Sequence, residues 1–354
     1  MLAGEATLAA CAPSAPSYPE ALDQTWQGFD ARAGDGLALR RELLRYATLA
    51  PSSHNTQCWR FAHDARGITI SPDFARRCPA VDPDDHHIFV SLGCATENLV
   101  LAAAAHGFRG GVAFDPAGDG AVRVELLPAK SARASVSYDA IPLRQSSRDA
   151  YDGRPLARPE LQALADAGTG PGIDVTLLTG KTQTDRVLDF VVQGNTAQMD
   201  DPAFMRELLA WMRFSDAEAV AKRDGLFTRC SGNPVLPRAI GRILFDHFYT
   251  VPSANDLYAK DIRSSAGIAV FSSAVSDRSH WVEAGRAYER FALLATALGI
   301  RTAMINQPVE VASLRPQFAG MLGLGNRRPD LVVRFGRGPL MPRSLRRPVS
   351  AVLV

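Results

Sequence analysis

The chain has 354 residues and a formal net charge of +2, from 39 basic and 37 acidic residues. Its 46% hydrophobic and 21% charged residues are typical of a globular protein and exclude a disordered, collagen-like or coiled-coil chain. The balanced charge gives no reason to expect nucleic-acid binding. At about 150 residues per domain, the length predicts two structural units.

We expect residues 1–36 to form an N-terminal tail. Leu2–Ala12 is apolar, and Leu8-Ala9-Ala10-Cys11 resembles a bacterial lipobox, but Glu5 interrupts the run and no basic segment precedes it. These features indicate either the remnant of an export signal or a disordered tail. As written, the chain is expected to be cytoplasmic. Export of the folded protein, or lipid anchoring in the cell envelope, is the alternative if a signal lies upstream.

Neither a cysteine-based structural site nor a membrane-spanning segment is expected. The five cysteines contain no C-x-x-C pair, so neither a disulfide framework nor a zinc site is predicted. No run of about 18 apolar residues occurs, so no transmembrane helix is predicted.

An amphipathic helix is predicted over Leu37–Leu49, and Pro51 ends it. A polar turn follows, whose consecutive side chains Ser52 to Gln57 can donate or accept hydrogen bonds. The turn could simply provide hydrogen bonds to the carbonyl groups at the end of the helix, and composition alone favours this interpretation. Alternatively, it could offer donors to a planar heteroaromatic ligand. Short strands are expected next, at Trp59–Phe61 and Gly67–Ser71.

One helical pattern occurs twice. Gly285–Gly299 repeats the glycines, alanines, glutamate and leucine of Gly93–Gly107 at a constant offset of 192 positions. Both copies have apolar residues at helical spacing and end at a glycine suited to a helix C-terminus. The small residues would let two helices approach closely. We interpret the repeat as a duplication.

Strand-like sequence follows each copy, at 111–114 and 122–127 after the first and at 301–305 and 331–335 after the second, while Gly267–Ser272 precedes the second. This alternation predicts an α+β fold of two diverged halves, 37–137 and 138–354, each with a mixed or antiparallel sheet flanked by helices.

The second half is longer, and the excess lies at about 195–260. This insertion contains an amphipathic stretch, Ala203–Arg213, and a Gly/Pro linker, Ser231–Pro237. It could close over a site as a lid or could simply pack the halves together.

Two basic segments could bind an anion. Arg144-Gln145-Ser146-Ser147-Arg148 places two guanidinium groups and two hydroxyls within five residues, which suits one phosphate. Pro342 to Pro348 contains Arg343, Arg346 and Arg347 and reads as a second phosphate-binding arm or as a basic tail. A solvated loop is the alternative for the first segment.

His86-His87 lack a third ligand at useful spacing and are expected to be capping or surface residues, so no metal is predicted.

Together, the A-P-S-S-H-N-T-Q-x-W turn, the R-x-S-x-R loop and the repeated helix resemble the nitroreductase superfamily of FMN flavoproteins. Over about 37–350 the chain is most similar to the Acg-like branch, in which one chain holds two diverged nitroreductase halves. Nitroreductases are usually dimers that bind FMN across the subunit interface. The resemblance therefore implies an intrachain pseudo-dimer, monomeric in solution. Because the P-S-x-x-N turn occurs only in the first half and R-x-S-x-R only in the second, one FMN per chain is expected.

The resemblance also implies roles for particular residues. The phosphate and ribityl chain of FMN would contact Arg144, Gln145, Ser146 and Arg148, and the phosphate site would be completed by Arg343, Arg346 or Arg347. The isoalloxazine ring and ribityl would lie along Pro51, Ser52, Ser53 and Asn55, with Gln57 as a secondary candidate and Asn306 and Gln307 at the flavin edge. Cys58 departs from the family pattern, which has proline there. A small buried side chain is expected at this position, with a redox-active thiol as the alternative.

By resemblance, the protein would pass hydride from NAD(P)H, a transient donor, through FMN to a nitroaromatic, a quinone or a similar small-molecule electron acceptor. The flavin carries the redox chemistry, so no catalytic side chain is expected. A flavin-storing or sequestering protein with little turnover is the alternative, if the lid stays closed. A cofactor-free scaffold with vestigial phosphate loops is a third possibility.

Overall fold

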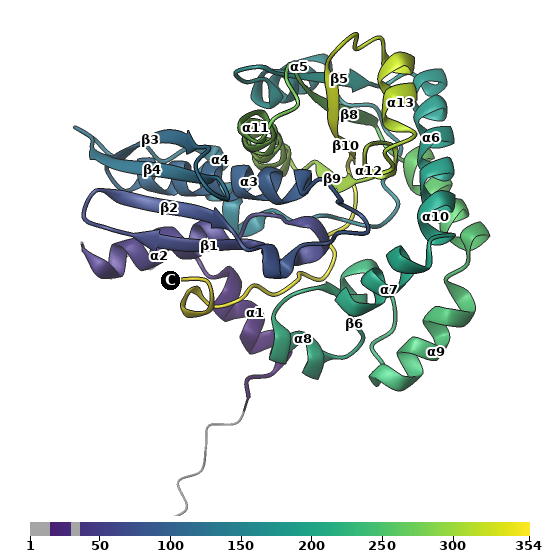
Figure 1. Ribbon diagram of the computed structural model, residues 1–354, viewed down its shortest axis with the longest axis horizontal. Coiled ribbons are helices and arrows are strands. Elements are labelled where there is room, and N and C mark those ends of the chain that lie inside the picture. The colour runs from purple at the N-terminus through teal and green to yellow at the C-terminus, as the bar shows by residue number, and fades with distance from the viewer. Residues whose placement is uncertain (1–14, 30–35) are drawn as a thin grey trace, which may run out of the picture.

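The computed structural model describes residues 15–29 and 36–354. The lipobox-like sequence at Leu2–Ala12 lies outside the described residues. The described residues form thirteen α-helices, which are labelled in Figure 1. Their bounds are α1 Tyr18–Trp26, α2 Leu37–Thr48, α3 His86–Ala105, α4 Val136–Ala140, α5 Arg158–Gly168, α6 Lys181–Met199, α7 Pro202–Trp211, α8 Asp216–Lys222, α9 Arg238–Phe248, α10 Val251–Arg263, α11 Arg278–Ala297, α12 Gln307–Glu310 and α13 Arg315–Leu322.

Two four-stranded antiparallel sheets have the same strand order, which supports a duplicated fold. The first has the order β1-β2-β4-β3, formed by β1 Trp59–His63, β2 Gly67–Pro72, β3 Phe108–Asp115 and β4 Ala121–Pro128. The second has the order β5-β8-β10-β9, formed by β5 Ile173–Leu178, β8 Gly267–Ser273, β9 Arg301–Met304 and β10 Arg328–Gly336. Between β5 and β8, where the first half has only a hairpin, the second half contains α6 to α10 and the short parallel pair β6 Met212–Arg213 and β7 Leu226–Phe227. The predicted α+β fold with two related halves is confirmed.

The repeated pattern forms the two central helices, α3 and α11, which pack against each other. A Cβ atom on Gly93 would lie less than 3.0 Å from the carbonyl oxygen of Val282, and a Cβ atom on Gly285 equally close to that of Val90. The backbones are therefore in contact, as the small residues predicted. Just beyond the two helix ends, Gly107 and Gly299 have φ values of 81° and 71°, the left-handed conformation that glycine adopts readily.

A single hydrophobic core joins both halves through these helices. It includes Phe61 and Val124 of the first sheet, Phe271 and Phe335 of the second, and Phe291 of α11. Among the described residues, α3 is the one helix long and apolar enough to cross a membrane, and 78% of its apolar window is buried within the protein. Its hydrophobicity is accounted for by this central position in the core.

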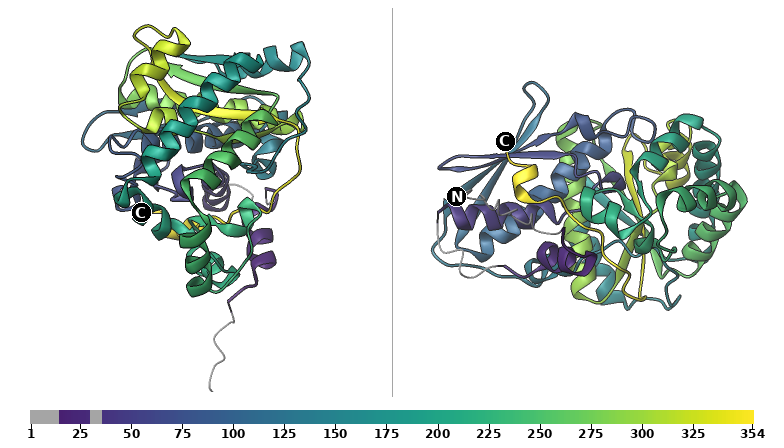
Figure 2. Two further views of the ribbon diagram at one scale, coloured as in Figure 1. Left: turned by 90° about the vertical axis from the view of Figure 1, so that its right-hand side faces the viewer. Right: turned by 90° about the horizontal axis from the view of Figure 1, so that it is seen from below.

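The end of the second half contributes backbone to the sheet of the first. Leu353, near the C-terminus, forms a parallel bridge with Phe61 of β1, and within the second half Ser146 forms a parallel bridge with Thr302 of β9. Figure 2 shows the yellow C-terminal segment returning from the second sheet to the first half. These isolated bridges are parallel, whereas the strand pairs within each of the two four-stranded sheets are antiparallel.

Part of the predicted tail is an ordered helix. A capping box between Ser17 and Glu20 begins α1, and its buried residues Tyr18 and Ala21 pack on Phe227 and on Leu345 of the C-terminal segment. The sequence signal was the S-x-x-E pattern typical of a helix N-terminus. Residues 15–29 are therefore not a disordered tail.

Candidate functional site

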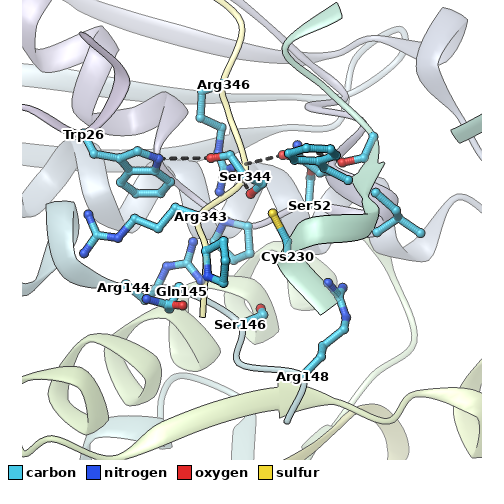
Figure 3. Close-up of a pocket in the computed structure, with 16 residues that line it drawn as sticks. Trp26, Ser52, Arg144, Gln145, Ser146, Arg148, Cys230, Arg343, Ser344 and Arg346 are labelled. Carbon is cyan, nitrogen blue, oxygen red and sulfur yellow. Dashed lines mark hydrogen bonds between the residues drawn. The ribbon is translucent and has the colours of Figure 1, made fainter. Parts of the chain in front are cut away.

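A pocket lies where the two halves, the insertion and α1 meet (Figure 3). Five chain segments contribute to it, none of them adjacent in sequence. The lining residues are Trp26, Pro51, Ser52, Asn55, Arg144, Gln145, Ser146, Arg148, Gly225, Leu226, Phe227, Cys230, Pro342, Arg343, Ser344 and Arg346.

The polar turn after α2 has an unusual backbone. His54, Asn55 and Gln57 have φ values of 47°, 52° and 55°, in the left-handed region that side chains other than glycine rarely occupy. The Ser52 hydroxyl accepts a hydrogen bond from the Gln57 N–H at 2.8 Å, which holds the turn together. Strained backbone of this kind persists where surrounding contacts enforce it and is concentrated at functional sites.

The side chains of Asn55 and Gln57 make hydrogen bonds that hold the turn in place. The Asn55 amide donates to the carbonyl oxygens of Gly225 and Leu345, both at 3.2 Å. Fully buried Gln57 donates to the Arg223 carbonyl at 2.8 Å and accepts from the Arg347 N–H at 2.7 Å. The turn thus ties the first half to the insertion and to the C-terminal segment.

Arg144 lies at the base of the pocket and is only 2% exposed. One of its terminal nitrogens, Nη2, donates to the Leu49 carbonyl at 3.1 Å, and Nε lies 3.3 Å from the buried Glu289 carboxylate. Burial raises the pKa of Glu289 to about 7, although the charge of Arg144 opposes that shift. Glu289 belongs to the repeated helix motif, so the duplicated pattern supplies the carboxylate beneath the pocket.

Two arginines of the C-terminal segment flank Trp26, with guanidinium carbons 5.2 Å (Arg343) and 5.1 Å (Arg346) from the indole ring centre. Arg346 is 6% exposed and donates to the Asn55 side-chain oxygen at 3.0 Å and to the Leu49 carbonyl at 3.2 Å. Burial, with a further contribution from Arg144, lowers the pKa of Arg346 to about 9. Burial also lowers the pKa of Arg343.

The remaining polar residues of the loop complete the pocket. Gln145 accepts a hydrogen bond from the Met341 N–H at 3.0 Å, and Ser146 lies beside it in Figure 3. Arg148 is exposed at the pocket and makes no ion pair with any residue in the described part of the chain. Its guanidinium group is therefore available to a ligand.

The donor set fits a phosphate group. Four arginines line the pocket, and one of them, Arg144, pairs with the buried Glu289. Nε of Arg346 is buried without a hydrogen-bond partner among the described residues, whereas Nε of Arg144 faces the Glu289 carboxylate. Unsatisfied buried guanidinium donors are costly, and a bound phosphate would supply acceptors to such an arginine cluster.

The structure separates the predicted residues into two groups. Nine line the pocket: Pro51, Ser52, Asn55, Arg144, Gln145, Ser146, Arg148, Arg343 and Arg346. Five do not line it: Ser53, Gln57, Asn306, Gln307 and Arg347. Gln57 and Arg347 bind each other as described, Asn306 accepts from the Val332 N–H at 2.8 Å, and Gln307 donates to the Tyr258 hydroxyl at 2.6 Å.

Sequence reasoning missed two contributors to the pocket. Trp26 belongs to the segment predicted as a tail, and Gly225 to Phe227 with Cys230 belong to the insertion. Only the lid hypothesis pointed to the insertion, and no sequence motif pointed to Trp26. Cys58 is 1% exposed, burial raises its pKa to about 11, and it does not line the pocket. This agrees with the expected small buried side chain.

The expectation for His86 and His87 was wrong. Both are buried, at 2% and 5% exposure, rather than on the surface. His86 contacts Asp330 and His87 contacts Glu310, residues more than 200 positions away that no local pattern could connect. Asp82 lies close to both rings and supplies the third potential ligand that spacing alone did not reveal.

Comparisons with known proteins agree with the proposed resemblance. No family model matches the chain. It is 28% identical over 327 residues to "Putative NAD(P)H nitroreductase Rv3131" of Mycobacterium tuberculosis, covering 88% of this chain and 90% of that protein. It is 21% identical over 328 residues to "Putative NAD(P)H nitroreductase acg" of the same organism, covering 88% and 94%. The resemblance to nitroreductases, and to the Acg-like branch in particular, is confirmed.

Solved structures with partial similarity include an FMN-bound nitroreductase from Bacteroides fragilis, at 16% identity and a TM-score of 0.37 over 60% of this chain and 96% of that one. Another is the FMN-dependent nitroreductase NfnB from Mycobacterium smegmatis in complex with NADPH, at 15% identity and a TM-score of 0.38 over 59% and 94%.

Proposed function

We propose that this chain is an FMN-dependent NAD(P)H oxidoreductase of the nitroreductase type, which reduces a nitroaromatic, a quinone or a similar small electron acceptor. The observation that carries the proposal is the convergence of the P-S-S-x-N turn of one half with the R-x-S-x-R loop of the other in a single pocket. The names of the relatives, each a "Putative NAD(P)H nitroreductase" matched over 90% or 94% of its length, support it.

In this proposal the arginines hold the FMN phosphate, which carries a charge of roughly −1.5 to −2 at neutral pH. Arg144 and Arg346 are fixed by buried hydrogen bonds and are therefore preorganised, while Arg148 is free to close on the ligand. Gln145 and Ser146 would contact the phosphate and ribityl chain, and Pro51, Ser52 and Asn55 would lie along the ribityl and ring. Ser53, Gln57, Asn306, Gln307 and Arg347 would act indirectly, through the loops that they hold.

One FMN per chain follows from the asymmetry of the two halves. In the second half, the segment equivalent to the polar turn connects α5 to β5 and consists only of Thr169-Gly170-Pro171-Gly172. It lacks the serine and asparagine side chains of the first turn. We therefore propose a monomeric pseudo-dimer with halves at 37–137 and 138–354, one cofactor site and a lid-like insertion at about 195–260.

Bound FMN would accept hydride from NADH or NADPH and deliver the electrons to the acceptor. The protein would contribute binding, orientation and exclusion of water, the last through Trp26, Leu226 and Phe227. No side chain needs to act as nucleophile in this scheme. The cytoplasm is the proposed compartment of the chain as written.

A second function, FMN storage without turnover, is favoured by one feature of the insertion. Its pocket-lining loop is tied to the polar turn in both directions, because the Gly225 N–H donates to the Asn55 carbonyl at 3.2 Å and the Asn55 amide donates back. A loop held in this way could keep NAD(P)H and acceptors from the flavin.

Anaerobic mixing of the flavin-loaded protein with NADPH, and separately with NADH, distinguishes the two functions. Rapid bleaching of the flavin absorbance, reversed by a nitroaromatic or a quinone, is expected for the oxidoreductase. Flavin that stays oxidised with both nucleotides but bleaches with dithionite supports storage. Flavin content is measured in the same preparation: about one FMN per chain is expected, and a value near two contradicts the single site. A chain that cannot be loaded with FMN overturns both functions.

A further inference from the structure

A cluster of ligand-bearing side chains lies at the start of α3, outside the FMN pocket. Asp82, His86 and His87 each place one potential ligand atom within 4.8 Å of those of the other two. Their exposed fractions are 3%, 2% and 5%, so all three are buried. The Asp82 carboxylate is oriented by the His87 N–H, which lies 3.1 and 2.9 Å from its two oxygens.

Both imidazoles are held by carboxylates of the other half of the chain. Nε2 of His86 lies 3.0 Å from Asp330 of β10, and Nε2 of His87 lies 3.4 Å from Glu310 of α12. Glu310 is itself fixed by Gln198, whose amide donates to it at 2.7 Å. An imidazole that donates its Nε2–H to a carboxylate presents a lone pair at Nδ1, which is the arrangement typical of metal-binding histidines. Neither Nδ1 forms a hydrogen bond with another described residue.

The charges around the cluster leave room for a cation. Five carboxylates gather there: Asp82, Asp84, Asp85, Glu310 and Asp330. Three arginines pair with them: Arg77, Arg315 and Arg328. One oxygen of Asp330 is also buried without a partner among the described residues, and Asp330 has no exposed surface. These carboxylates therefore outnumber the arginines that pair with them.

We propose that Asp82, His86 and His87 bind one divalent transition-metal ion, for which Zn²⁺ is the best match. Two imidazoles and one carboxylate form a ligand set that suits zinc and disfavours Mg²⁺ and Ca²⁺, which prefer oxygen ligands. Zinc bonds of about 2.1 Å place ligand atoms at most ~4.2 Å apart, so the side chains would close by less than 1 Å around the ion.

The ion would have a structural role. Its ligands belong to the first half, and the carboxylates that orient them belong to the second half. Metal binding would therefore fasten the start of α3 to β10 and α12, across the junction of the halves. This site is independent of FMN, since none of its residues lines the pocket.

The test uses the full chain, purified without chelator, with metal content measured directly. The protein is then stripped with a chelator and titrated with Co²⁺, whose visible absorption reports on its ligands. We expect about one metal ion per chain, a saturable Co²⁺ spectrum that Zn²⁺ abolishes, and a midpoint of thermal unfolding that falls on stripping and recovers with Zn²⁺.

Two variants remove ligands, His87→Gln and Asp82→Asn, and each is expected to weaken Co²⁺ binding at least tenfold. The matched control is His280→Gln. His280 pairs with Asp277 at 2.8 Å at the start of α11, the partner helix, and no third ligand joins it among the described residues. This control should bind Co²⁺ as the unaltered chain does.

The unaltered protein decides the question if a ligand variant does not fold. Absence of metal after purification, together with no Co²⁺ spectrum and no effect of Zn²⁺ on unfolding, would overturn the proposal. The cluster would then be a buried ion-pair network only. Equal loss of Co²⁺ binding in His280→Gln and His87→Gln would overturn it as well.

Discussion

Gly93 of α3 and Gly285 of α11 occupy equivalent positions at the crossing of the two central helices. Each faces a carbonyl oxygen of the other helix, Val282 for Gly93 and Val90 for Gly285. The two carbonyls are separated in sequence by the same 192 positions as the two glycines. A contact in which each side meets the equivalent group of the other is the signature of a two-fold interface, here between two halves of one chain.

Gly285→Ala should destabilise the protein, because the added methyl group would overlap the Val90 carbonyl and force α3 and α11 apart. Overpacking of this kind costs about 1–3 kcal/mol, and rigid backbone on both sides places this site at the upper end. Urea unfolding followed by circular dichroism measures the change. Gly320→Ala in α13 is the control, since a Cβ there meets nothing within 4 Å and should be neutral or slightly stabilising. Equal stability of Gly285→Ala and the unaltered chain would contradict this packing.

Arg148→Ala should weaken FMN binding without harming the fold. The side chain is exposed and is not needed by a protein partner, whereas a charged hydrogen bond to phosphate contributes about 1.5–3 kcal/mol. That corresponds to a loss of roughly ten- to a hundredfold in affinity. Fluorescence titration of the flavin-free protein with FMN provides the measurement.

Arg154→Ala is the matched control for this prediction. Arg154 follows the same loop and pairs with Asp152 at 2.8 Å, but it lies outside the pocket. FMN affinity should be unchanged in this variant. If both variants bind FMN alike, the assignment of the phosphate site to the loop is wrong.

The sequence predicted the parts of the fold and site that local patterns encode. The repeat led to α3, α11 and their close contact because glycine spacing directly reflects backbone approach. Arg144, Arg148 and Asn55 were found because their motifs are contiguous. Trp26 and the loop around Cys230 were missed, since their place at the pocket depends on how distant segments pack. The partners of His86 and His87 were missed for the same reason, because Glu310 and Asp330 come from the other half.

Trp26→Ala should speed the release of FMN. Its ring lies against Arg343 and Arg346, and its indole N–H donates to the Ser344 carbonyl at 3.0 Å, so the residue holds both arginines over the pocket. A cation–π contact contributes about 0.5–2 kcal/mol. Loss of the contacts to both arginines is therefore expected to increase the dissociation rate of FMN severalfold or more.

Stopped-flow displacement of FMN measures that rate. Trp211→Ala is a close control, because Trp211 also contacts two arginines, Arg76 at 5.3 Å and Arg213 at 5.8 Å, and none of the three lines the pocket. Unchanged release in Trp26→Ala, or the same acceleration in both variants, would show that Trp26 does not retain the cofactor.

Glu289→Gln should remove a pH dependence of stability that the unaltered protein has. Burial raises the pKa of this carboxyl from 4.5 to about 7 in the folded state. Between those values the folded state binds more protons than the unfolded state, so the free energy of unfolding falls as pH rises. A pKa shift of this size contributes on the order of 3 kcal/mol to the free energy of unfolding at low pH. This contribution is fully lost above about pH 7.

The charged and titratable groups that act on Glu289 include Arg144, Arg346, Glu97, Tyr288 and Cys94, with Asn98 as a hydrogen-bond partner. As pH rises from about 5 to about 8, the Glu289→Gln variant should therefore become more stable relative to the unaltered chain. Urea unfolding at both pH values measures it. Glu125→Gln in β4 is the control, because Glu125 is exposed and is not among the groups that act on Glu289. A parallel pH profile for Glu289→Gln and the unaltered chain would show that Glu289 does not take up a proton in this range, and that its carboxylate stays paired with Arg144.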